Sequence, residues 1–525
     1  MIFKSARAEV SIPNVSLTEF VLERAATYGD RAALVDGVSG RTITYRQLPE
    51  LIRRAAAGLH AKGFRKGDVM ALFSPNLPEY AVAFHAVSTL GGTNTTLNPL
   101  YTVDEIVKQL RDARARFILT IPPFMDRAQA AAKQVGIDAI FVFGEAEGAT
   151  PFASLLANDG TFPAPTIDPA NDVVALPYSS GTTGLPKGVM LTHRNLVANL
   201  TQIEDTQRLG PEDSCIAVLP FFHIYGMTVI LNMAVRKGAT IVSLPRFELE
   251  PFLEVMQNHK ITVAYLVPPI VLALAKHPAI DKYDLRALRT IFSGAAPLDH
   301  GVARECCDRL SCVIVQGYGM TETSPVTHVV SDQPGHTKLA SVGPLVPNTE
   351  CKVVDTATGT AVGVGERGEI CVRGPQVMKG YLGNPEATNA MIDRDGWLHT
   401  GDIGYADAEG DFFVVDRVKE LIKYKGFQVA PAELEAILLA HPAVADAAVI
   451  GQPDLEAGEV PKGFVVLRVK VEPAELMAHV AERVAPHKKL RVVEIVDQIP
   501  KSPTGKILRR VLVERERQRI GAAGG

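Results

Sequence analysis

Cysteine and net charge are both scarce in this 525-residue chain, and each scarcity excludes a class of protein. The six cysteines include no C-x-x-C pair, which argues against a disulfide framework and favours a reducing compartment. A formal net charge of −4 provides no global field that would hold nucleic acid or an anionic membrane. Any phosphate group that the protein binds must therefore be held by a local site.

Long hydrophobic runs are also missing, apart from one stretch. Residues 215–235 carry no formal charge and are long enough to cross a bilayer, but Pro220, His223, Gly226 and Asn232 interrupt them. We expect a buried strand, a turn and a buried helix there, and no membrane span. The N-terminus lacks the apolar core of a signal peptide and the C-terminus carries no peroxisomal or lipidation signal, so the expected location is cytoplasmic.

The order of the patterns along the chain predicts more than one domain. From a capping box at Ser16–Glu19 to about residue 160, strands such as Val69–Phe73 alternate with helical stretches such as Tyr80–Thr89, and the first helix is expected to run to Ala26. This alternation indicates a parallel sheet covered by helices. A proline-rich linker and a second α/β section follow.

Two changes of pattern follow. Past residue 340, short strands separated by glycine turns predict a small antiparallel unit. After Asp416 the pattern becomes that of a separate α+β domain of about a hundred residues, with a helix expected at 433–441.

Residues 178–188, Tyr-Ser-Ser-Gly-Thr-Thr-Gly-Leu-Pro-Lys-Gly, carry the strongest chemical signal. Glycines allow a backbone to present several N–H groups to one anion, and the hydroxyls and the lysine add further donors. The segment is not a Walker A loop, because Pro186 precedes Lys187 and Gly188 stands where a Ser or Thr would bind magnesium. It predicts a polyphosphate cradle, with a flexible surface loop as the plainer alternative.

Two other patterns are better explained without chemistry. Gly363–Gly368 matches G-x-G-x-x-G, but no strand leads into it and a strand follows it, so a hairpin is favoured over a dinucleotide site. Cys306, Cys307 and Cys312 lack metal-ligand spacing and an adjacent histidine, and we expect buried thiols.

Three further segments follow the glycine-rich loop in order: residues 316–322 (Gln-Gly-Tyr-Gly-Met-Thr-Glu), 381–402, ending in Gly-Trp-Leu-His-Thr-Gly-Asp, and 502–506 (Ser-Pro-Thr-Gly-Lys). Together the four motifs resemble those of the adenylate-forming superfamily, which contains acyl-CoA synthetases, luciferases and the adenylation domains of peptide synthetases. Within that superfamily, residues 222–225 and 423–434 most resemble 4-coumarate–CoA ligases.

The resemblance implies an α/β fold in two domains. A large N-terminal domain (1–416) would combine α/β sheets with a small β-barrel-like subdomain, and a smaller, mobile α+β domain (417–525) would carry a catalytic lysine. It also implies two half-reactions: a carboxylate attacks the α-phosphate of ATP to give an acyl-adenylate and pyrophosphate, and then coenzyme A displaces AMP. ATP and coenzyme A are the implied cosubstrates and Mg²⁺ the implied cofactor.

By the same resemblance, the nucleotide site comprises Ser179, Ser180, Gly181, Thr182, Thr183, Lys187, Gln316, Gly317, Tyr318, Thr321, Asp402, Arg417, Lys419, Lys423, Gln428 and Lys506. The loop residues and Lys187 would hold the leaving phosphates, and Thr321 the α-phosphate. Glu322 would ligate Mg²⁺, as suits a hard cation that takes one or two carboxylates. Asp402 would accept hydrogen bonds from the ribose, and Arg417 would mark the hinge between the domains.

The implied catalytic residues are Lys506, His223 and Thr321. Lys506 would bridge the substrate carboxylate and the α-phosphate, although a solvated lysine in a charged run is the plain alternative. His223 would orient the carboxylate or gate the thiol path, although a lone histidine in an apolar run is more often a core residue.

The acyl pocket is implied at His223, Tyr225, Gly294, Gly317, Pro325 and Val326, and coenzyme A is implied to contact Lys425, Gly426 and Phe427. Tyr225 could stack on a flat ring or donate a hydrogen bond to it. Thr323 and Ser324 depart from the family, since plant enzymes commonly have Ala-Gly there, which affects the expected preference for ring substituents.

The leading hypothesis is an ATP- and Mg²⁺-dependent acid–thiol ligase joining 4-coumarate or a related hydroxycinnamate to coenzyme A. A medium- or long-chain fatty acyl-CoA synthetase is the alternative, since it shares every catalytic motif and differs in pocket depth. A luciferase-like monooxygenase, a module loading an external carrier and an inactive binding protein are less favoured. The expected partners are small molecules, not nucleic acid. A lysine acetyltransferase acting on Lys506 would silence the enzyme by removing its charge.

Overall fold

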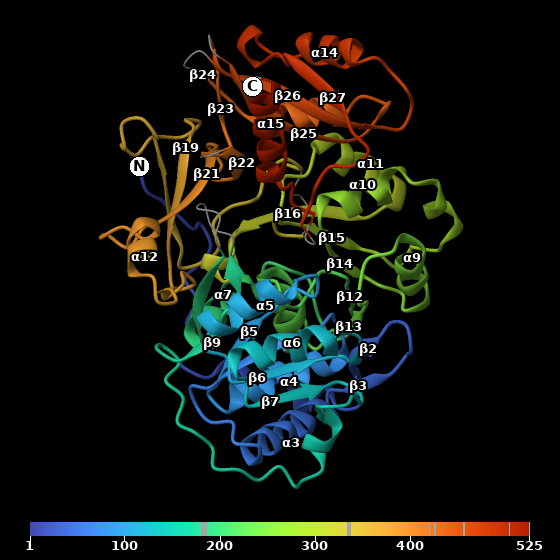
Figure 1. The fold of residues 1–525 in the computed structure, drawn as a ribbon, viewed down its shortest axis with the longest axis vertical. Helices are drawn as coiled ribbons and strands as arrows, with labels where there is room; N and C mark the ends of the chain where they lie inside the picture. The colour runs from blue at the N-terminus through green and yellow to red at the C-terminus, as the bar shows by residue number, and fades with distance from the viewer. Residues whose placement is uncertain are drawn as a thin grey trace.

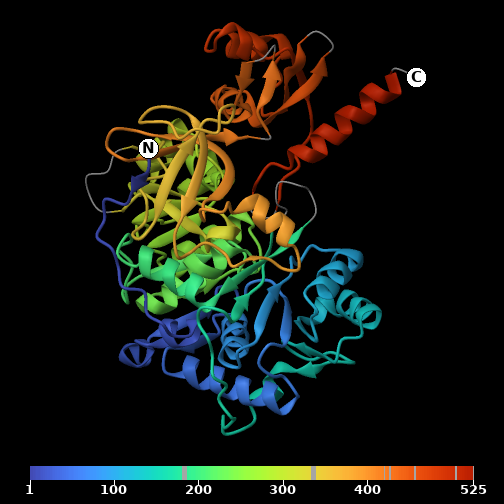
Figure 2. The same ribbon diagram turned by 90° about the vertical axis from the view of Figure 1, so that its left-hand side faces the viewer.

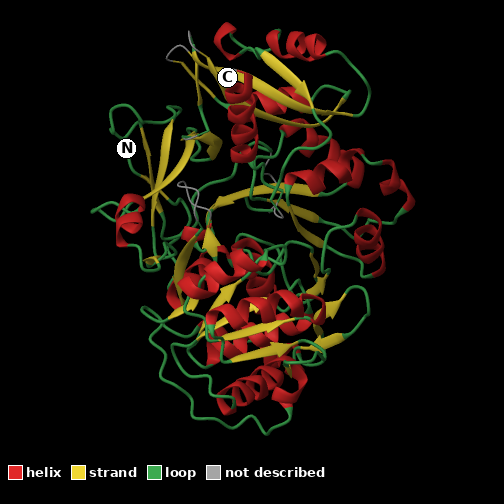
Figure 3. Ribbon diagram, in the orientation of Figure 1, coloured by secondary structure: helices red, strands yellow, loops and turns green. Residues whose placement is uncertain are grey.

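The computed structural model describes residues 1–179, 186–332, 338–418, 420–424, 427–454, 457–502 and 505–523, and of residues 427–428 and 520–523 only the backbone. Helices and strands are mixed throughout (Figure 3), as the predicted α/β class requires. The first part of the chain forms the lower body in Figure 1, an antiparallel unit stands at its left, and the C-terminal unit lies across the top.

The first large sheet is built mainly by the N-terminal section. Its strands, in spatial order, are β10 (Tyr178–Ser179), β11 (Lys187–Thr192), β9 (Val173–Ala175), β5 (Thr93–Thr96), β4 (Val69–Phe73), β6 (Phe117–Thr120), β7 (Ala139–Val142) and β8 (Thr150–Pro151), with β20 (Gly380–Tyr381) paired to β11. Its principal helices are α3 (Gln47–Ala61), α4 (Pro78–Thr89), α5 (Val103–Asp112) and α6 (Met125–Val135). Strands β5, β4, β6 and β7 are parallel, which confirms the prediction from alternating strands and helices.

The second large sheet follows the same plan. Its order is β17 (Val326–Val329), β16 (Val313–Gly319), β15 (Thr290–Ser293), β14 (Val263–Leu266), β12 (Ser214–Ala217), β13 (Thr240–Ser243), β2 (Ala32–Asp36) and β3 (Thr42–Thr44). Its helices include α7 (His193–Ile203), α9 (Leu249–Asn258), α10 (Pro268–Lys276) and α11 (His300–Leu310). Strands β16 to β2 are parallel, so the carboxyl ends of β12, β15 and β16 lie at the same edge of the sheet.

The uncharged stretch 215–235 is buried within this second layer, as predicted. Strand β12 leads through a turn into the π-helix η3 (Tyr225–Asn232) and the short helix α8 (Met233–Lys237). A side chain on Gly226 would place its Cβ 2.1 Å from the Pro220 carbonyl oxygen, so this tight return requires glycine. Among the described residues, no helix is long and apolar enough to span a membrane.

The first helix is shorter than the sequence predicts. Ser16 caps α1 (Leu17–Leu22) as expected, because its hydroxyl accepts the Glu19 amide at 3.3 Å. The helix ends at Leu22 and α2 (Ala25–Tyr28) starts afresh. The buried guanidinium of Arg236 donates to the Phe20 carbonyl at 2.7 Å, and this contact occupies an acceptor that a continuing helix would use.

The antiparallel unit forms a third sheet in the order β1 (Phe3–Lys4), β18 (Glu350–Val354), β19 (Gly368–Arg373), β21 (Leu398–Ala406) and β22 (Phe412–Arg417), with helix α12 (Pro385–Met391) beside it (Figure 1). Gly363–Gly368 lies where the chain returns from β18 to its antiparallel partner β19, which supports the hairpin and not a dinucleotide site. All six cysteines are unpaired; Cys306 and Cys312 are buried, as expected, while Cys307 is half-buried.

The C-terminal unit has a sheet and hydrophobic core of its own. The sheet contains β23 (Ile422–Tyr424), β24 (Phe427–Val429), β25 (Val444–Asp454), β26 (Gly458–Leu467) and β27 (Val492–Ile495), with helices α13 (Pro431–Leu439), α14 (Pro473–Ala481) and α15 (Arg509–Ala523). Leu434, Val449, Val465 and Leu476 are among the core residues. Helix α15 projects outward from this unit in Figure 2. The middle of this helix is tied to the sheet by Glu516, which pairs with the fully buried Lys462 at 2.6 Å.

Candidate active site

A cavity of about 1240 Å³ lies where the three parts of the molecule meet. Segments that follow β12, β15 and β16 supply one wall, and the carboxyl ends of parallel strands are where open α/β sheets place their ligands. The antiparallel unit contributes Thr400, Gly401 and Arg417, and the C-terminal unit contributes Ser502 and Lys506. The four sequence motifs therefore converge on one space.

His223 lies in the turn between β12 and the π-helix and lines this cavity. Burial, with a smaller effect from the positive charge of Lys506, lowers the pKa of His223 to about 4, so the ring is neutral at physiological pH. Its Nδ1 accepts the Tyr225 backbone N–H at 3.2 Å, which assigns the single ring proton to Nε2. The neutral ring of His223 therefore has an N–H at Nε2 and lies on the cavity wall rather than in the closed core.

Lys506 enters the cavity from the C-terminal unit. Burial, reinforced by repulsion from Arg417, lowers the pKa of Lys506 to about 8, while Glu420 and Asp402 act in the opposite direction. Its backbone N–H donates to the Ser502 hydroxyl at 3.1 Å, which closes the loop. A Cβ on the preceding Gly505 would lie 3.1 Å from Pro269, so this loop rests directly on the start of α10.

Asp402 and Arg417 face each other across strands β21 and β22. Arg417 Nε lies 3.0 Å from Asp402 Oδ1, and the Tyr318 hydroxyl donates to Oδ2 at 2.6 Å. Burial raises the pKa of Asp402, whereas Arg417 opposes that rise. Arg417 lines the cavity and Asp402 lies behind it, within a strand rather than in a turn.

The segment after Asp416 is held by buried charges. Asp416 accepts the backbone N–H groups of Arg417 at 2.7 Å and Ala432 at 3.0 Å, and burial raises the pKa of Asp416 to about 6. Arg509 pairs with Glu420 at 2.6 Å and with Glu435 at 2.7 Å. This network joins the start of the C-terminal unit to the base of α15.

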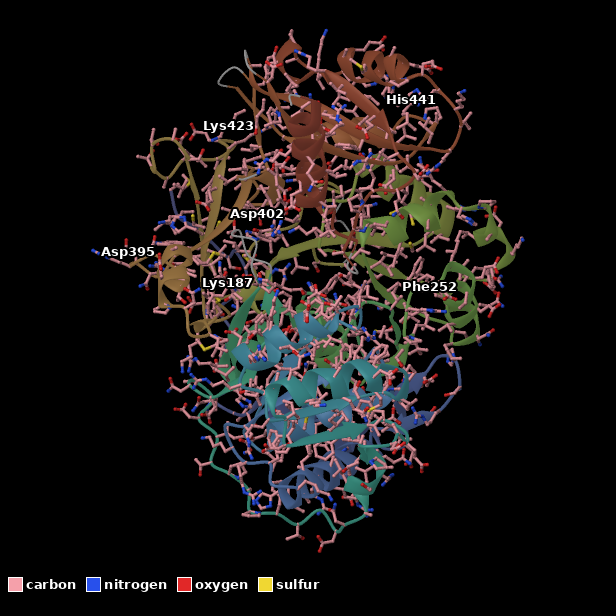
Figure 4. All side chains as sticks on the ribbon, in the orientation of Figure 1. Lys187, Phe252, Asp395, Asp402, Lys423 and His441 are labelled. Carbon is pink, nitrogen blue, oxygen red and sulfur yellow. The ribbon has the colours of Figure 1, made fainter. Side chains whose placement is uncertain are left out.

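Glu322, Tyr381 and Lys187 form a second charged group beside the cavity. The Tyr381 hydroxyl donates to Glu322 Oε1 at 2.8 Å, and the Lys187 ammonium lies 5.1 Å from the centre of the Tyr381 ring. Lys187 is also the cross-strand partner of Ser179, so the glycine-rich loop begins and ends on paired strands. Figure 4 shows Lys187 and Asp402 on the side of the molecule where the antiparallel unit meets the lower body.

The predicted acyl-pocket residues do line the cavity: His223, Tyr225, Gly294, Gly317, Pro325 and Val326. The Tyr225 hydroxyl donates to the Phe292 carbonyl at 3.1 Å, so its ring face, rather than its hydroxyl, is the part offered to a ligand. Thr323 and Ser324 are buried outside the lining, and their hydroxyls donate to the carbonyls of Pro325 and Gln376. The departure at these two positions therefore does not change the pocket wall.

Some predicted nucleotide residues lie elsewhere or outside the described residues. Gln316 is buried behind the cavity, where its amide bonds the backbone of Leu298 and Leu339. Lys423 is exposed in the C-terminal unit, away from Lys187 and Asp402 (Figure 4). Ser180, Gly181, Thr182, Thr183, Lys419, Lys425 and Gly426, and the side chains of Phe427 and Gln428, are outside the described residues. Ser179, Gly317, Tyr318, Thr321 and Glu322 all line the cavity.

Sequence reasoning missed two residues of this region. Tyr381 was seen only as part of a motif, and Glu420, which lines the cavity and pairs with Arg509, was not considered. No local pattern marks Glu420. Tyr381 could have been found by asking what satisfies a buried carboxylate such as Glu322.

Comparisons with known proteins agree with this geometry. Residues 21–382 match the family of AMP-binding enzymes, and residues 433–506 match the C-terminal domain of AMP-binding enzymes. The chain is 46% identical to 4-coumarate–CoA ligase 5 of Oryza sativa subsp. japonica over 523 residues, covering 97% of this chain and 96% of that relative. It is 44% identical to 4-coumarate–CoA ligase 2 of Petroselinum crispum over 524 residues, covering 98% and 96%.

Solved structures show the same architecture. ATP-bound MatB from Rhodopseudomonas palustris matches with a TM-score of 0.88 and 30% identity, covering 96% of this chain and 99% of that chain. The anthranilate CoA ligase AuaEII in complex with anthranoyl-AMP matches with a TM-score of 0.89 and 27% identity, covering 97% and 98%. The chain therefore belongs to the adenylate-forming superfamily of AMP-binding enzymes.

Proposed function

We propose that this protein is an ATP-dependent carboxylate–CoA ligase that forms an acyl-adenylate and then an acyl-CoA thioester, with 4-coumarate or a related hydroxycinnamate as the acid. The observation that carries the reaction is the meeting of His223, Thr321 and Lys506, from different elements, in one cavity. The acid is inferred from relatives named 4-coumarate–CoA ligases. The match to these relatives covers nearly the whole length of both chains.

In the first half-reaction, His223 and Lys506 hold the carboxylate. The neutral His223 donates its Nε2–H to one carboxylate oxygen, and the Lys506 ammonium stabilises the charge that collects between the attacking oxygen and the α-phosphate. Thr321 donates to the α-phosphate. Pyrophosphate leaves toward the segment between Ser179 and Lys187, while Arg417 reaches the ribose and Asp402, behind it, positions Arg417 through their ion pair.

The residues present fit a magnesium ion. Glu322 is buried at the cavity wall, and the Tyr381 hydroxyl fixes one of its oxygens, which orients a hard oxygen donor as Mg²⁺ prefers. When bound with ATP, the ion would neutralise phosphate charge. The described residues near it, Thr321 and Lys187, would position the phosphates by hydrogen bonding and charge.

The arrangement of the units suits adenylation rather than thioester formation. Lys506 lies in the cavity whereas Lys423 is exposed, and the chain matches ATP-bound MatB with a TM-score of 0.88 but apo MatB with 0.78. We infer that the C-terminal domain (417–525) turns about Asp416 and Arg417 relative to the N-terminal domain (1–416) before coenzyme A reacts. Lys425, Gly426 and Phe427 would then face coenzyme A.

Two further proposals rest on the sequence. A lysine acetyltransferase acting on Lys506 would remove the cation that adenylation needs, because acetylation neutralises the amine. Its test is the adenylation rate of protein acetylated at Lys506, verified by mass spectrometry; a normal rate would contradict it.

The cytoplasmic location is likewise a prediction from the sequence.

The deciding experiment is acid-dependent pyrophosphate release from MgATP, with and without coenzyme A, for cinnamic, coumaric, caffeic, ferulic and benzoic acids and for medium- and long-chain fatty acids. We expect coumarate to be turned over with coenzyme A and fatty acids to react weakly. A preference for an alkyl chain would refute the hydroxycinnamate assignment while leaving the ligase chemistry intact. Absence of acid-dependent pyrophosphate release would refute the ligase itself.

A further inference from the structure

Outside the cavity, a carboxylate, a thiol and an imidazole meet on the antiparallel unit. His399 Nδ1 lies 2.9 Å from Glu369 Oε2 and 3.4 Å from Cys371 Sγ, and the three potential ligand atoms lie within 4.8 Å of one another. From this juxtaposition we propose that Glu369, Cys371 and His399 form a binding site for one transition-metal dication of the zinc class. The site has no part in the ligase reaction proposed above.

The two strands assemble these groups without help from loops. Cys371 of β19 and His399 of β21 are direct cross-strand partners. Glu369 precedes Cys371 by two positions and therefore projects from the same face of β19. Zinc bonds of about 2.0–2.3 Å in tetrahedral geometry place neighbouring ligand atoms about 3.5 Å apart. The separations of 2.9 Å and 3.4 Å from His399 Nδ1 are close to that spacing, and all three atoms lie within 4.8 Å of one another.

The surroundings orient the ligands as metal sites do. His399 Nε2 lies 3.5 Å from Asp393 Oδ2, so a carboxylate faces the ring nitrogen that would not bind the metal. Asp393 is itself fixed, because its Oδ1 accepts the backbone N–H groups of Asp395 and Trp397, both at 2.9 Å. The second oxygen of Glu369 accepts the Gly401 N–H at 2.9 Å. Glu369 is thus held by a backbone hydrogen bond, and His399 faces a carboxylate that is itself fixed.

An ion pair without a metal is the competing explanation. Hydrogen bonds to Cys371 and Glu369 raise the pKa of His399 to about 10. The resulting imidazolium would pair with Glu369 at one ring nitrogen and with Asp393 at the other. Lys352 also pairs with Asp393. In that account the buried thiol of Cys371 serves only to pack with Val354 and Trp397, although it approaches the nitrogen that Glu369 already occupies. A metal ion uses all three groups.

The donor set also selects the class of metal. A thiolate with an imidazole suits zinc and its neighbours, whereas Mg²⁺ takes oxygen ligands. The side chains of His399 and Glu369 are 32% and 19% exposed, so an ion can enter from the surface and keep water as a further ligand. The adjoining loop with Asp395 forms the outer rim of this unit in Figure 4.

The first test is Zn²⁺ titration of the full-length protein after treatment with a chelator, followed by competition with a chromophoric chelator. We expect one Zn²⁺ bound in a manner that releases protons, and Co²⁺ in its place should give thiolate-to-cobalt charge-transfer absorption. Cys371→Ser and His399→Gln should abolish this site, and Asp393→Asn should weaken it by about 10- to 100-fold. Cys312→Ser, which removes a buried thiol elsewhere, is the matched control.

The single tryptophan gives an independent readout. Trp397 packs with Cys371 and Val354, so Zn²⁺ should change its fluorescence in the parent protein and in Cys312→Ser but not in His399→Gln. Thermal unfolding without metal checks that each variant folds. Failure of the parent protein to bind Zn²⁺, or equal binding by His399→Gln, would overturn the proposal and leave the imidazolium ion pair as the explanation.

Discussion

Two lysines of the C-terminal unit, Lys462 and Lys506, stand in opposite electrostatic situations. Lys462 is fully buried in the sheet and pairs with Glu494 at 2.7 Å and Glu516 at 2.6 Å. Lys506 is partly buried and lines the cavity, and no ion pair among the described residues includes its ammonium. Among the charges that act on the pKa of Lys506, the positive Arg417 has the largest effect, and Glu420 and Asp402 oppose it more weakly.

This difference separates a structural lysine from a reactive one. A buried cation that is compensated by two carboxylates holds elements together, here the sheet and α15. A buried cation that lacks such compensation is destabilised until an anion enters, and its interaction with that anion is correspondingly strong. The same residue type therefore serves folding at position 462 and, in the proposed mechanism, chemistry at position 506.

The largest effect is expected from Lys462→Ala. Removing the cation leaves Glu516 buried without its partner, which should lower the opening free energy of β26 and α15 by about 3–5 kcal/mol. Native-state hydrogen exchange measures this locally. Lys488→Ala, which breaks a partly exposed pair with Glu433, is the control and should cost less, about 1 kcal/mol. Equal losses in the two variants would remove the distinction drawn above.

Lys506→Ala should affect the reaction and not the fold. We expect adenylation to slow by about two to three orders of magnitude, the size of one lost preorganised contact to developing charge. Thioester formation from pre-made acyl-adenylate should fall much less, as single-turnover assays of each step would show. Lys501→Ala, which removes a neighbouring lysine paired with Asp446, is the control. An equal fall in both half-reactions would contradict the role given to Lys506.

The pH dependence of adenylation sharpens the comparison further. Because the pKa of Lys506 is lowered to about 8, the ammonium is present below that pH and is lost above it. The adenylation kcat/KM should therefore fall about tenfold per pH unit above the pKa. Lys506→Arg, whose guanidinium stays charged, should show a flat profile over this range at a lower rate. An unchanged alkaline limb in that variant would assign the titration to another group.

The smallest effect is expected where the sequence departs from plant enzymes. The double substitution Thr323→Ala with Ser324→Gly removes two hydroxyls that bond backbone carbonyls, and relieves a positive φ of 72° at Ser324. These changes oppose each other, so the stability should change by only about 1 kcal/mol. The order of preference among hydroxycinnamates should stay the same, as competition assays would report. A changed order would show that these residues act on the pocket at a distance.

The sequence predicted elements better than their relations in space. Strand Val69–Phe73 was predicted with its observed bounds, because buried parallel strands appear as short apolar runs between turn signals. The early end of α1 could not be predicted, because the group that donates a hydrogen bond to the Phe20 carbonyl belongs to Arg236, which is far away in the chain. Local patterns contain no information on such contacts.

The same limit applies to the site. His223, Thr321 and Lys506 were identified through motifs and do line one cavity. Motifs did not show that the Gln316 side chain is hydrogen-bonded to the backbone of Leu298 and Leu339. They also did not show that Lys423 is exposed in this arrangement. Which side of a strand a residue faces, and how two domains are oriented, are decided by tertiary packing.

The ring of Tyr381 has a consequence for how tightly a nucleotide can be bound. It holds Glu322 at its hydroxyl and Lys187 over its face, so opposite charges occupy two parts of one rigid plane. Long charged side chains normally lose rotamer freedom when a ligand arrives, at about 1 kcal/mol or more each. Here Tyr381 already restricts both side chains in the folded protein, so in the proposed nucleotide site less rotamer freedom would be lost when the triphosphate binds.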